Sequence, residues 1–320
     1  MRATRAFLGL SHTPLLDLNP VDTGLRGEID TLLDAVRDAV RRFDPERIVL
    51  IGPDHYNGFF NALMPPFCLG SEATAVGDYT TPAGPLNVDA EAALALADWL
   101  MDHDFDVAVS RRMQVDHGFS QALQLLWGGL KTPPVIPLFM NAVAAPGIPR
   151  LRRCHALGAA IGQWLDTTSP RTLLIGSGGL SHEPPVPTLA HPDPQVRERI
   201  TVPRAPTPAE REAKTQRVMA AGRALAAGDP AMKRLNPVWD AVWMAALADG
   251  RLDALMTQSE SAITDEAGLS AHESKTWLIA RAALLDHPVQ LEVRGYHEVP
   301  AWIAGYGALF LRTLPEGVHP

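Results

Sequence analysis

The chain has 320 residues, of which 46% are hydrophobic and 20% are charged, so it can form a substantial core and is not intrinsically disordered. Its net charge of −8 and the lack of a basic run argue against a protein that binds nucleic acids or a membrane surface. The only two cysteines, Cys68 and Cys154, argue against a disulfide framework and against a cysteine-based zinc site.

Five short apolar runs, each ending in polar or glycine-rich residues, predict buried strands at 6–10, 47–51, 107–110, 135–140 and 172–175. A first helix has one apolar face from Ile29 to Val40 and ends at Asp44-Pro45. Further helices are predicted at about 89–102, 119–127, 151–165, 208–226, 238–248 and 272–285. Strands that alternate with helices indicate a three-layer α/β/α sandwich with a mostly parallel, mixed central sheet.

No repeat or low-complexity tract divides the chain, so we expect one domain over residues 1–320. Residues 183–208 break the pattern with eight prolines. Proline removes backbone donors and fixes φ, so this segment is predicted to be neither helix nor central strand. Two interpretations remain open: an ordered excursion that acts as a lid, or a plain connector.

The N-terminus begins basic and then apolar, as a signal peptide does. However, Ser11-His12 and Pro14 interrupt the apolar run, and no small-residue cleavage site follows. No stretch of about eighteen apolar residues predicts a membrane span. We therefore expect a cytoplasmic protein.

Four histidines follow predicted strands or stand where a loop enters a helix: His12, His55, His117 and His182. In open α/β sheets, ligands bind beyond the carboxyl ends of parallel strands, so these loops are predicted to bring the four imidazoles together. One loop histidine alone would be an ordinary surface or core residue, but four at equivalent positions favour a site. Six others are predicted to be structural or surface residues: His103, His155, His191, His287, His297 and His319.

Imidazoles with a carboxylate and without thiolates suit Fe(II), Zn(II) or Mn(II). Five carboxylates are candidates for completing such a site: Asp54, Asp116, Glu183, Asp240 and Glu273. Asp54, Asp116 and Glu183 each adjoin one of the four candidate histidines, and adjacent residues rarely both point at one metal. Glu273 opens a predicted helix, where a carboxylate is also favoured by the helix dipole without any ligand. Spacing alone leaves the choice open.

Seven segments resemble the type III, LigB-type extradiol catechol dioxygenases, and they extend from about residue 8 to about residue 307. They are GLSHTPL, LIGPDHYNGFFNALMPPFCLG, MQVDHGF, GSGGLSHEPPVP, LNPVWD, AHESKTW and AWIAGYG. The two long segments with DHYNGFF and GSGGLSH are the specific ones. The resemblance therefore covers nearly the whole chain and implies the LigB-like fold.

The resemblance implies a role for each residue that matches a family motif. It implies that His12, His55 and Glu273 bind Fe(II), that His117 is the proton donor and that His182 is the proton acceptor. No residue is identified for the side chain of the substrate. Where family members have glutamine next to that proton acceptor, this chain has Glu183, which we expect to raise the basicity of His182 if it is ionised.

The implied reaction is extradiol ring cleavage by O₂. The segments are most similar to those of family members that cleave 3-(2,3-dihydroxyphenyl)propionate, which implies that substrate and 2,3-dihydroxycinnamate. Another catechol such as protocatechuate, a zinc-dependent hydrolase in the same pocket, and a non-catalytic protein on this fold remain as alternatives. The expected partners are the catechol and O₂, with no nucleic acid and no membrane, and the chain is expected to form a homo-oligomer.

Overall fold

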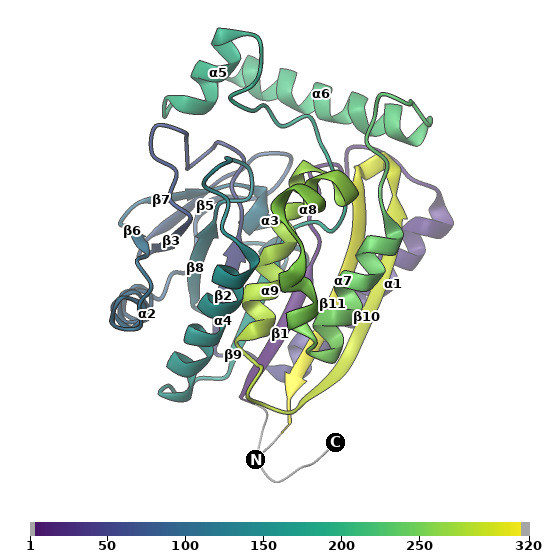
Figure 1. Ribbon diagram of the computed structural model, residues 1–320. Helices are drawn as coiled ribbons and strands as arrows, with labels where there is room; N and C mark the ends of the chain where they lie inside the picture. Colours follow the sequence, from purple (N-terminus) through teal and green to yellow (C-terminus); the bar gives the residue numbers. More distant parts are fainter. Residues whose placement is uncertain (1–3, 315–320) are drawn as a thin grey trace.

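The structure is a computed structural model that describes residues 4–314. Its centre is an eight-stranded mixed sheet in the order β10-β11-β1-β9-β2-β8-β3-β6 (Figure 1). The strands of this sheet are β1 (Arg5–Leu10), β2 (Arg47–Gly52), β3 (Phe67–Gly70), β6 (Ala108–Ser110), β8 (Val135–Met140), β9 (Thr172–Ser177), β10 (Val289–Val299) and β11 (Ala304–Thr313). A second sheet has three strands in the order β5-β4-β7, which are β4 (Ala73–Val76), β5 (Ala83–Pro85) and β7 (Met113–Val115).

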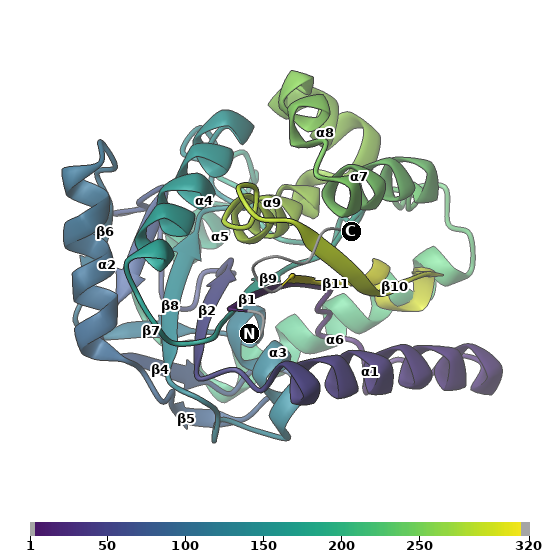
Figure 2. The same ribbon diagram turned by 90° about the horizontal axis from the view of Figure 1, so that it is seen from below.

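Helices cover both faces of the large sheet, which makes the three predicted layers (Figure 2). Residues of α1 (Thr23–Phe43) and α3 (His117–Trp127) belong to the hydrophobic cluster on one face, together with residues of the small sheet. The cluster on the other face contains residues of α2 (Ala90–Asp102), α4 (Leu151–Asp166), α7 (Pro237–Asp249), α8 (Glu260–Ala267) and α9 (Lys275–Ala282). Short 3₁₀ helices are η1 (Leu252–Thr257), η2 (Leu269–Ser274) and η3 (Pro300–Trp302).

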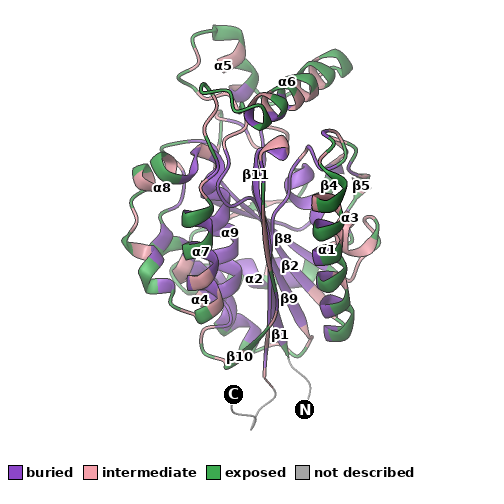
Figure 3. Ribbon diagram, turned by 90° about the vertical axis from the view of Figure 1, so that its right-hand side faces the viewer, coloured by how far each residue is buried: buried purple, intermediate pink, exposed green. Residues whose placement is uncertain are grey.

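The central strands are buried on both faces, as their continuous apolar runs predict (Figure 3). In β2, Val49 and Ile51 contribute to one hydrophobic cluster while Ile48 and Leu50 contribute to the other, because successive side chains of a strand point to opposite faces. β1 pairs in parallel with β9, and β9 pairs in parallel with β2. The carboxyl ends of these three strands therefore lie at one edge.

All five predicted strands are confirmed, with bounds that differ by at most two residues. Six further strands within residues 4–314 were not predicted, namely β3, β4, β5, β7, β10 and β11. The helix predicted over 272–285 is wrong in its first turn, because residues 269–274 form η2 and α9 begins only at Lys275. Glu273 therefore lies in the 3₁₀ turn before this helix and does not open it.

The proline-rich segment 183–208 contains α5 (Pro194–Thr201), so the prediction that it has no helix is wrong over those residues. Asp193 caps this helix by accepting the N–H of Gln195, and Pro194 stands in the first turn, where a missing N–H costs nothing. The next helix, α6 (Pro208–Ala226), lies with α5 across the carboxyl ends of the central strands (Figure 1). Within residues 4–314, no helix is long and apolar enough to cross a membrane.

Candidate active site

The carboxyl ends of β1, β2 and β9 bring three of the four predicted histidines together. His12 follows β1, His55 follows β2, and His182 follows β9. His117 comes from the loop after β7 and begins α3. The ring centroids of His12 and His55 are 5.8 Å apart, and that of His117 lies 5.2 Å from His12 and 4.6 Å from His55. All four histidines are buried, so the predicted cluster is present.

Glu273 lies at the centre of this cluster. Its Oε1 atom is 3.1 Å from Nε2 of His55 and 3.3 Å from Nε2 of His182. Its Oε2 atom is 3.3 Å from Nε2 of His12 and accepts the N–H of Gly179 at 3.2 Å. The side chain is fully buried. The Nε2 atoms of three imidazoles therefore point at one carboxylate.

The Nδ1 atoms of His12 and His55, which point away from Glu273, each have a hydrogen-bond partner. Nδ1 of His55 lies 3.0 Å from Oδ2 of Asp116, and Nδ1 of His12 lies 3.0 Å from Oγ of Ser177. A carboxylate only accepts hydrogen bonds, so Nδ1 of His55 carries the hydrogen and Nε2 is left to face Glu273. Metal-binding histidines are typically oriented in this way, through a hydrogen bond from the nitrogen that does not bind.

His117 and His182 are oriented by two different acceptors. Oδ2 of Asp78 accepts from Nδ1 of His117 at 2.7 Å, and Oδ1 of Asp78 accepts the backbone N–H of His117 at 2.8 Å. Nδ1 of His182 donates to the carbonyl of Leu180 at 3.0 Å. In both rings Nε2 is the nitrogen available for proton transfer. At Nδ1, His117 is thus held by a negatively charged carboxylate and His182 by a neutral carbonyl.

The electrostatics favour a charged Glu273. Burial raises the pKa of this carboxyl, but the charge of the His182 imidazole and the hydrogen bonds from His182 and His55 outweigh burial and hold the pKa well below its usual value. Burial lowers the pKa of His12 to about 3, so this imidazole is neutral. For His55, burial lowers the pKa, but Asp116 and Glu273 together raise it well above its usual value. Glu273 is thus ionised, while His12 is neutral and His55 favours its protonated form.

The donor set fits a divalent metal. Two sets of three side chains could hold it, and both contain His12 and His55. The third member is Glu273 in one set and His117 in the other. Imidazoles and a carboxylate without thiolates suit Fe(II), Zn(II) or Mn(II). A third group within metal-binding distance, Asp78, Asp116 and His117, is already occupied by hydrogen bonds from His117 and His55.

The other carboxylate candidates lie elsewhere. Asp54 accepts the backbone N–H groups of residues 57–59, and Asp240 accepts from the backbone and hydroxyl of Ser181. Glu183 accepts the N–H of Leu269 at 2.9 Å. Burial lowers the pKa of His182, but Glu273 raises it above its usual value. Glu273 is therefore a carboxylate that raises the basicity of His182, whereas the carboxylate of Glu183 is engaged by the backbone of Leu269.

The site opens into a cavity of about 500 Å³. Pro184 to Pro187 and residues of α5 and α6 form its outer wall, so the proline-rich segment covers the site. His191, predicted to be a structural or surface residue, lines this cavity, and its Nδ1 accepts the N–H of Asp193. His319 lies outside the described residues.

Sequence reasoning missed two kinds of residue in this site. Asp78 stands in the loop after β4, 39 positions before His117, and no spacing in the chain links the two. Arg211 and Lys214 also line the cavity. The signal for them was available in part, because they share one face of the correctly predicted helix at 208–226.

Comparisons with known proteins identify the family of this chain. The family model described as the catalytic LigB subunit of aromatic ring-opening dioxygenase matches residues 6–307. A protein of Comamonas testosteroni named 2,3-dihydroxyphenylpropionate/2,3-dihydroxicinnamic acid 1,2-dioxygenase is 65% identical over 311 residues, covering 97% of each chain. A protein of the same name from Burkholderia vietnamiensis strain G4 is 47% identical over 304 residues, covering 95% of this chain and 96% of its own.

A solved structure supports the fold alone. The crystal structure of the uncharacterized protein JW3007 from Escherichia coli K12 superimposes with a TM-score of 0.50 at 14% identity. The match covers 97% of this chain and 99% of that chain. The family match and the two close relatives extend over nearly the whole sequence. This chain belongs to the LigB family of aromatic ring-opening dioxygenases.

Proposed function

We propose that this protein is an Fe(II)-dependent extradiol dioxygenase that cleaves 3-(2,3-dihydroxyphenyl)propionate, and also 2,3-dihydroxycinnamate, with O₂. The product would be 2-hydroxy-6-oxonona-2,4-dienedioate. The observation that carries the proposal is the convergence of His12, His55 and Glu273 beneath an open cavity, with His117 and His182 beside them. The names of the relatives at 65% and 47% identity support the choice of substrate.

In the proposed site, His12 and His55 hold the metal through Nε2, and Glu273 holds it through its carboxylate. When bound, a ferrous ion supplies a point where a catechol and O₂ meet, and it lowers the pKa of the catechol hydroxyls. Asp116 and Ser177 keep the two imidazoles oriented. The ionised Glu273 offsets part of the metal charge.

His182 takes the proton of a catechol hydroxyl at Nε2. Its Nδ1–H is held by the carbonyl of Leu180, so Nε2 is the nitrogen that accepts. Histidine suits this step because it titrates near neutral pH, and Glu273 increases its basicity. The proton then stays on the imidazole of His182.

His117 donates a proton from Nε2 when the bond between the two oxygen atoms breaks. Asp78 accepts from Nδ1 and so stabilises the doubly protonated ring that this step requires. The two histidines thus divide the acid and base roles, and their Nδ1 atoms are held differently: that of His117 by a carboxylate and that of His182 by a backbone carbonyl. The segment Pro184–Pro187 and the helices α5 and α6 limit access of water to the site.

The test is anaerobic loading with Fe(II), followed by 3-(2,3-dihydroxyphenyl)propionate and then air. A yellow ring-fission product formed with one O₂ per substrate supports the proposal. Turnover under argon, or with Zn(II) alone, contradicts it and indicates a hydrolase. Faster turnover of protocatechuate would support ring cleavage but contradict the proposed substrate.

We also propose that residues 1–320 act as one domain, that the chain forms a homo-oligomer and that it works in the cytoplasm. The first point is supported by the family match over residues 6–307. The third is supported by Cys68 and Cys154, which are buried and free, as in a reducing compartment. Light scattering after size-exclusion chromatography tests the oligomer, and a monomer would contradict it.

A further inference from the structure

The wall of the cavity carries a charge opposite to that of the whole protein. The chain has a net charge of −8. Apart from histidines, however, the charged residues around the cavity are two carboxylates, Asp78 and Glu210, and five cations, Arg199, Arg204, Arg211, Lys214 and Arg217. All five cations come from the segment that contains α5 and α6. A cationic wall facing a binding cavity indicates a ligand with negative charge.

The two carboxylates leave most of this positive charge in place, because only Glu210 pairs with one of the five cations, Arg204. Asp78 accepts hydrogen bonds from the ring and the backbone of His117, and Glu210 accepts them from the two terminal guanidinium nitrogens of Arg204. Within residues 4–314, the side chains of Arg211 and Arg217 have no hydrogen-bond or ion-pair partner. An arginine that lines a cavity without a partner has its five donors free for a ligand.

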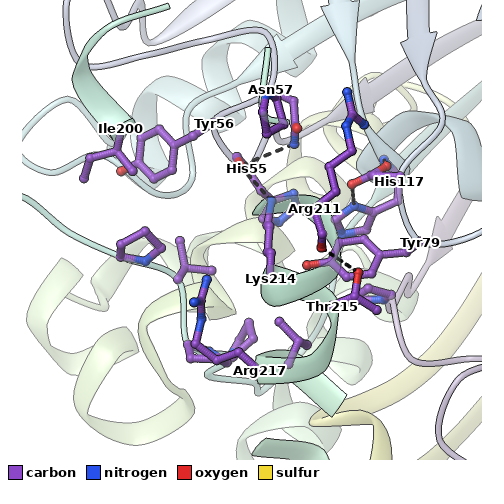
Figure 4. A pocket seen from close by; sticks show the side chains of 18 of the residues that line it. His55, Tyr56, Asn57, Tyr79, His117, Ile200, Arg211, Lys214, Thr215 and Arg217 are labelled. Atoms are coloured by element: carbon purple, nitrogen blue, oxygen red, sulfur yellow. Dashed lines mark hydrogen bonds and ion pairs between the residues drawn. The ribbon is translucent and has the colours of Figure 1, made fainter. Parts of the chain in front are cut away.

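Arg211 and Lys214 stand out among these cations because of their position. They are three residues apart on α6, so they share one face of the helix, and both are partly buried. Nζ of Lys214 donates to the backbone carbonyl of His55 at 3.3 Å and lies 5.7 Å from the ring centroid of Tyr79. Figure 4 shows both side chains extending from α6 on the side of the cavity that holds His55 and His117. Arg217 is exposed.

We propose that Arg211 and Lys214 form the subsite that binds the side-chain carboxylate of the substrate. This inference rests on the proposed function, which places the two hydroxyls of the ring at the histidine cluster. The propionate arm then extends from the ring toward another part of the cavity wall. Arg211 can bind the carboxylate through two parallel hydrogen bonds, while Lys214 adds a second positive charge. The pair therefore selects acids over neutral catechols.

The first experiment compares the acid with a neutral molecule of the same shape, 3-(2,3-dihydroxyphenyl)propanamide. In Arg211→Met and in Lys214→Met, we expect kcat/KM for the acid to fall by about 10- to 100-fold, mainly through KM, as expected for loss of a charged hydrogen bond. For the amide, kcat/KM should change less than about threefold. Arg223→Met, on the same helix but outside the cavity, is the matched control and should leave both substrates unchanged. Equal losses for acid and amide would overturn the proposal.

A second experiment measures binding without turnover, so that it does not depend on the proposed reaction. Calorimetry with 3-phenylpropionate and 3-phenylpropanamide should show that wild type prefers the acid and that each variant loses this preference. Lys214→Arg, which keeps the charge, should retain most of it. If wild type binds both molecules equally, the subsite is wrong even where ring cleavage is confirmed. If wild type prefers the acid but cleaves no catechol, the subsite stands and the proposed function fails.

Metal content separates a direct role of Lys214 from an effect on His55. Lys214 donates to the backbone carbonyl of His55, so an indirect effect through that histidine is the alternative to test. We expect Lys214→Met to hold as much metal as wild type. Loss of metal in this variant, together with an equal loss of activity toward acid and amide, would remove Lys214 from the subsite.

Discussion

Gly9 and Gly176 are register partners on the adjacent parallel strands β1 and β9, and Trp277 of α9 packs against both. A Cβ atom on Gly9 would lie 2.2 Å from the indole of Trp277, and one on Gly176 would lie 2.6 Å from its backbone. The two glycines thus allow α9 to approach the sheet closely. Glu273, four residues before Trp277, is carried to the strand ends by this contact.

The first prediction concerns these glycines. Gly176→Ala should destabilise the protein by about 1–3 kcal/mol, because the added methyl group meets backbone that cannot move aside. It should also weaken metal binding by displacing Glu273. Chemical denaturation and metal titration measure the two effects. Gly27→Ala on α1, where a Cβ atom meets nothing within 4 Å, is the control and should stabilise the protein slightly. Unchanged stability in the Gly176 variant would refute the packing argument.

Part of this site can be predicted from the sequence, and there are physical reasons why the rest cannot. His12, His55 and His182 were placed correctly because each follows an apolar strand, and parallel strands end at one edge. The carboxylate was harder, since Glu273 comes from a 3₁₀ turn nearly a hundred residues away from Gly179. Spacing alone left it among five candidates, and only the resemblance to the family selected it.

Asp78 shows what local patterns do not contain. It contacts His117 only because the small sheet pairs β4 with β7 in parallel, which brings the loop after β4 next to the start of α3. The small sheet was not predicted, so this contact had no basis in the sequence pattern. The edge strand β10 was also not predicted, but its sequence does contain the pattern of a strand, because Val289, Leu291 and Val293 alternate with polar residues.

The second prediction tests Asp78. Asp78→Asn should lower kcat by about 10²-fold or more, because asparagine does not stabilise a doubly protonated His117 and its amide group disturbs the tautomer. KM and metal content should remain near wild type. Asp38→Asn on the surface of α1 is the matched control. Normal kcat in the Asp78 variant would show that this carboxylate has no part in proton donation.

The third prediction separates the proton-transfer histidines from the metal ligands. His117→Ala and His182→Ala should each hold about one metal ion per chain, yet lose ring cleavage by about 10²- to 10⁴-fold. The reason is that Glu273, His12 and His55 remain in place in both variants. Elemental analysis and the colour of the product give the two readouts. Loss of metal from His117→Ala would favour the alternative group of three histidines instead.

The fourth prediction is a dependence of metal binding on pH. In the metal-free protein, burial lowers the pKa of His55, but Asp116 and Glu273 raise it well above its usual value, so the imidazole is protonated at neutral pH. A metal must displace this proton. Affinity should therefore rise with pH, by about tenfold per unit, until the pKa of His55 is passed.

Calorimetry in buffers of different ionisation enthalpy measures this proton release for Zn(II) or for anaerobic Fe(II). We expect about one proton from His55 per metal ion. Asp116→Asn removes the carboxylate that contacts Nδ1 and should reduce the release at neutral pH. A heat of binding that is the same in all buffers would show that His55 is not protonated before the metal binds.

The central claim is that His12, His55 and Glu273 together hold one metal ion, and the metal content of Glu273→Ala tests it most directly. Both carboxylate oxygens face imidazole nitrogens at 3.1–3.3 Å, so their loss should remove the only charged donor of the three. The variant should bind metal at least about 100-fold more weakly than wild type, while remaining folded by circular dichroism. A Glu273→Ala protein that retains one tightly bound metal ion per chain would contradict the account.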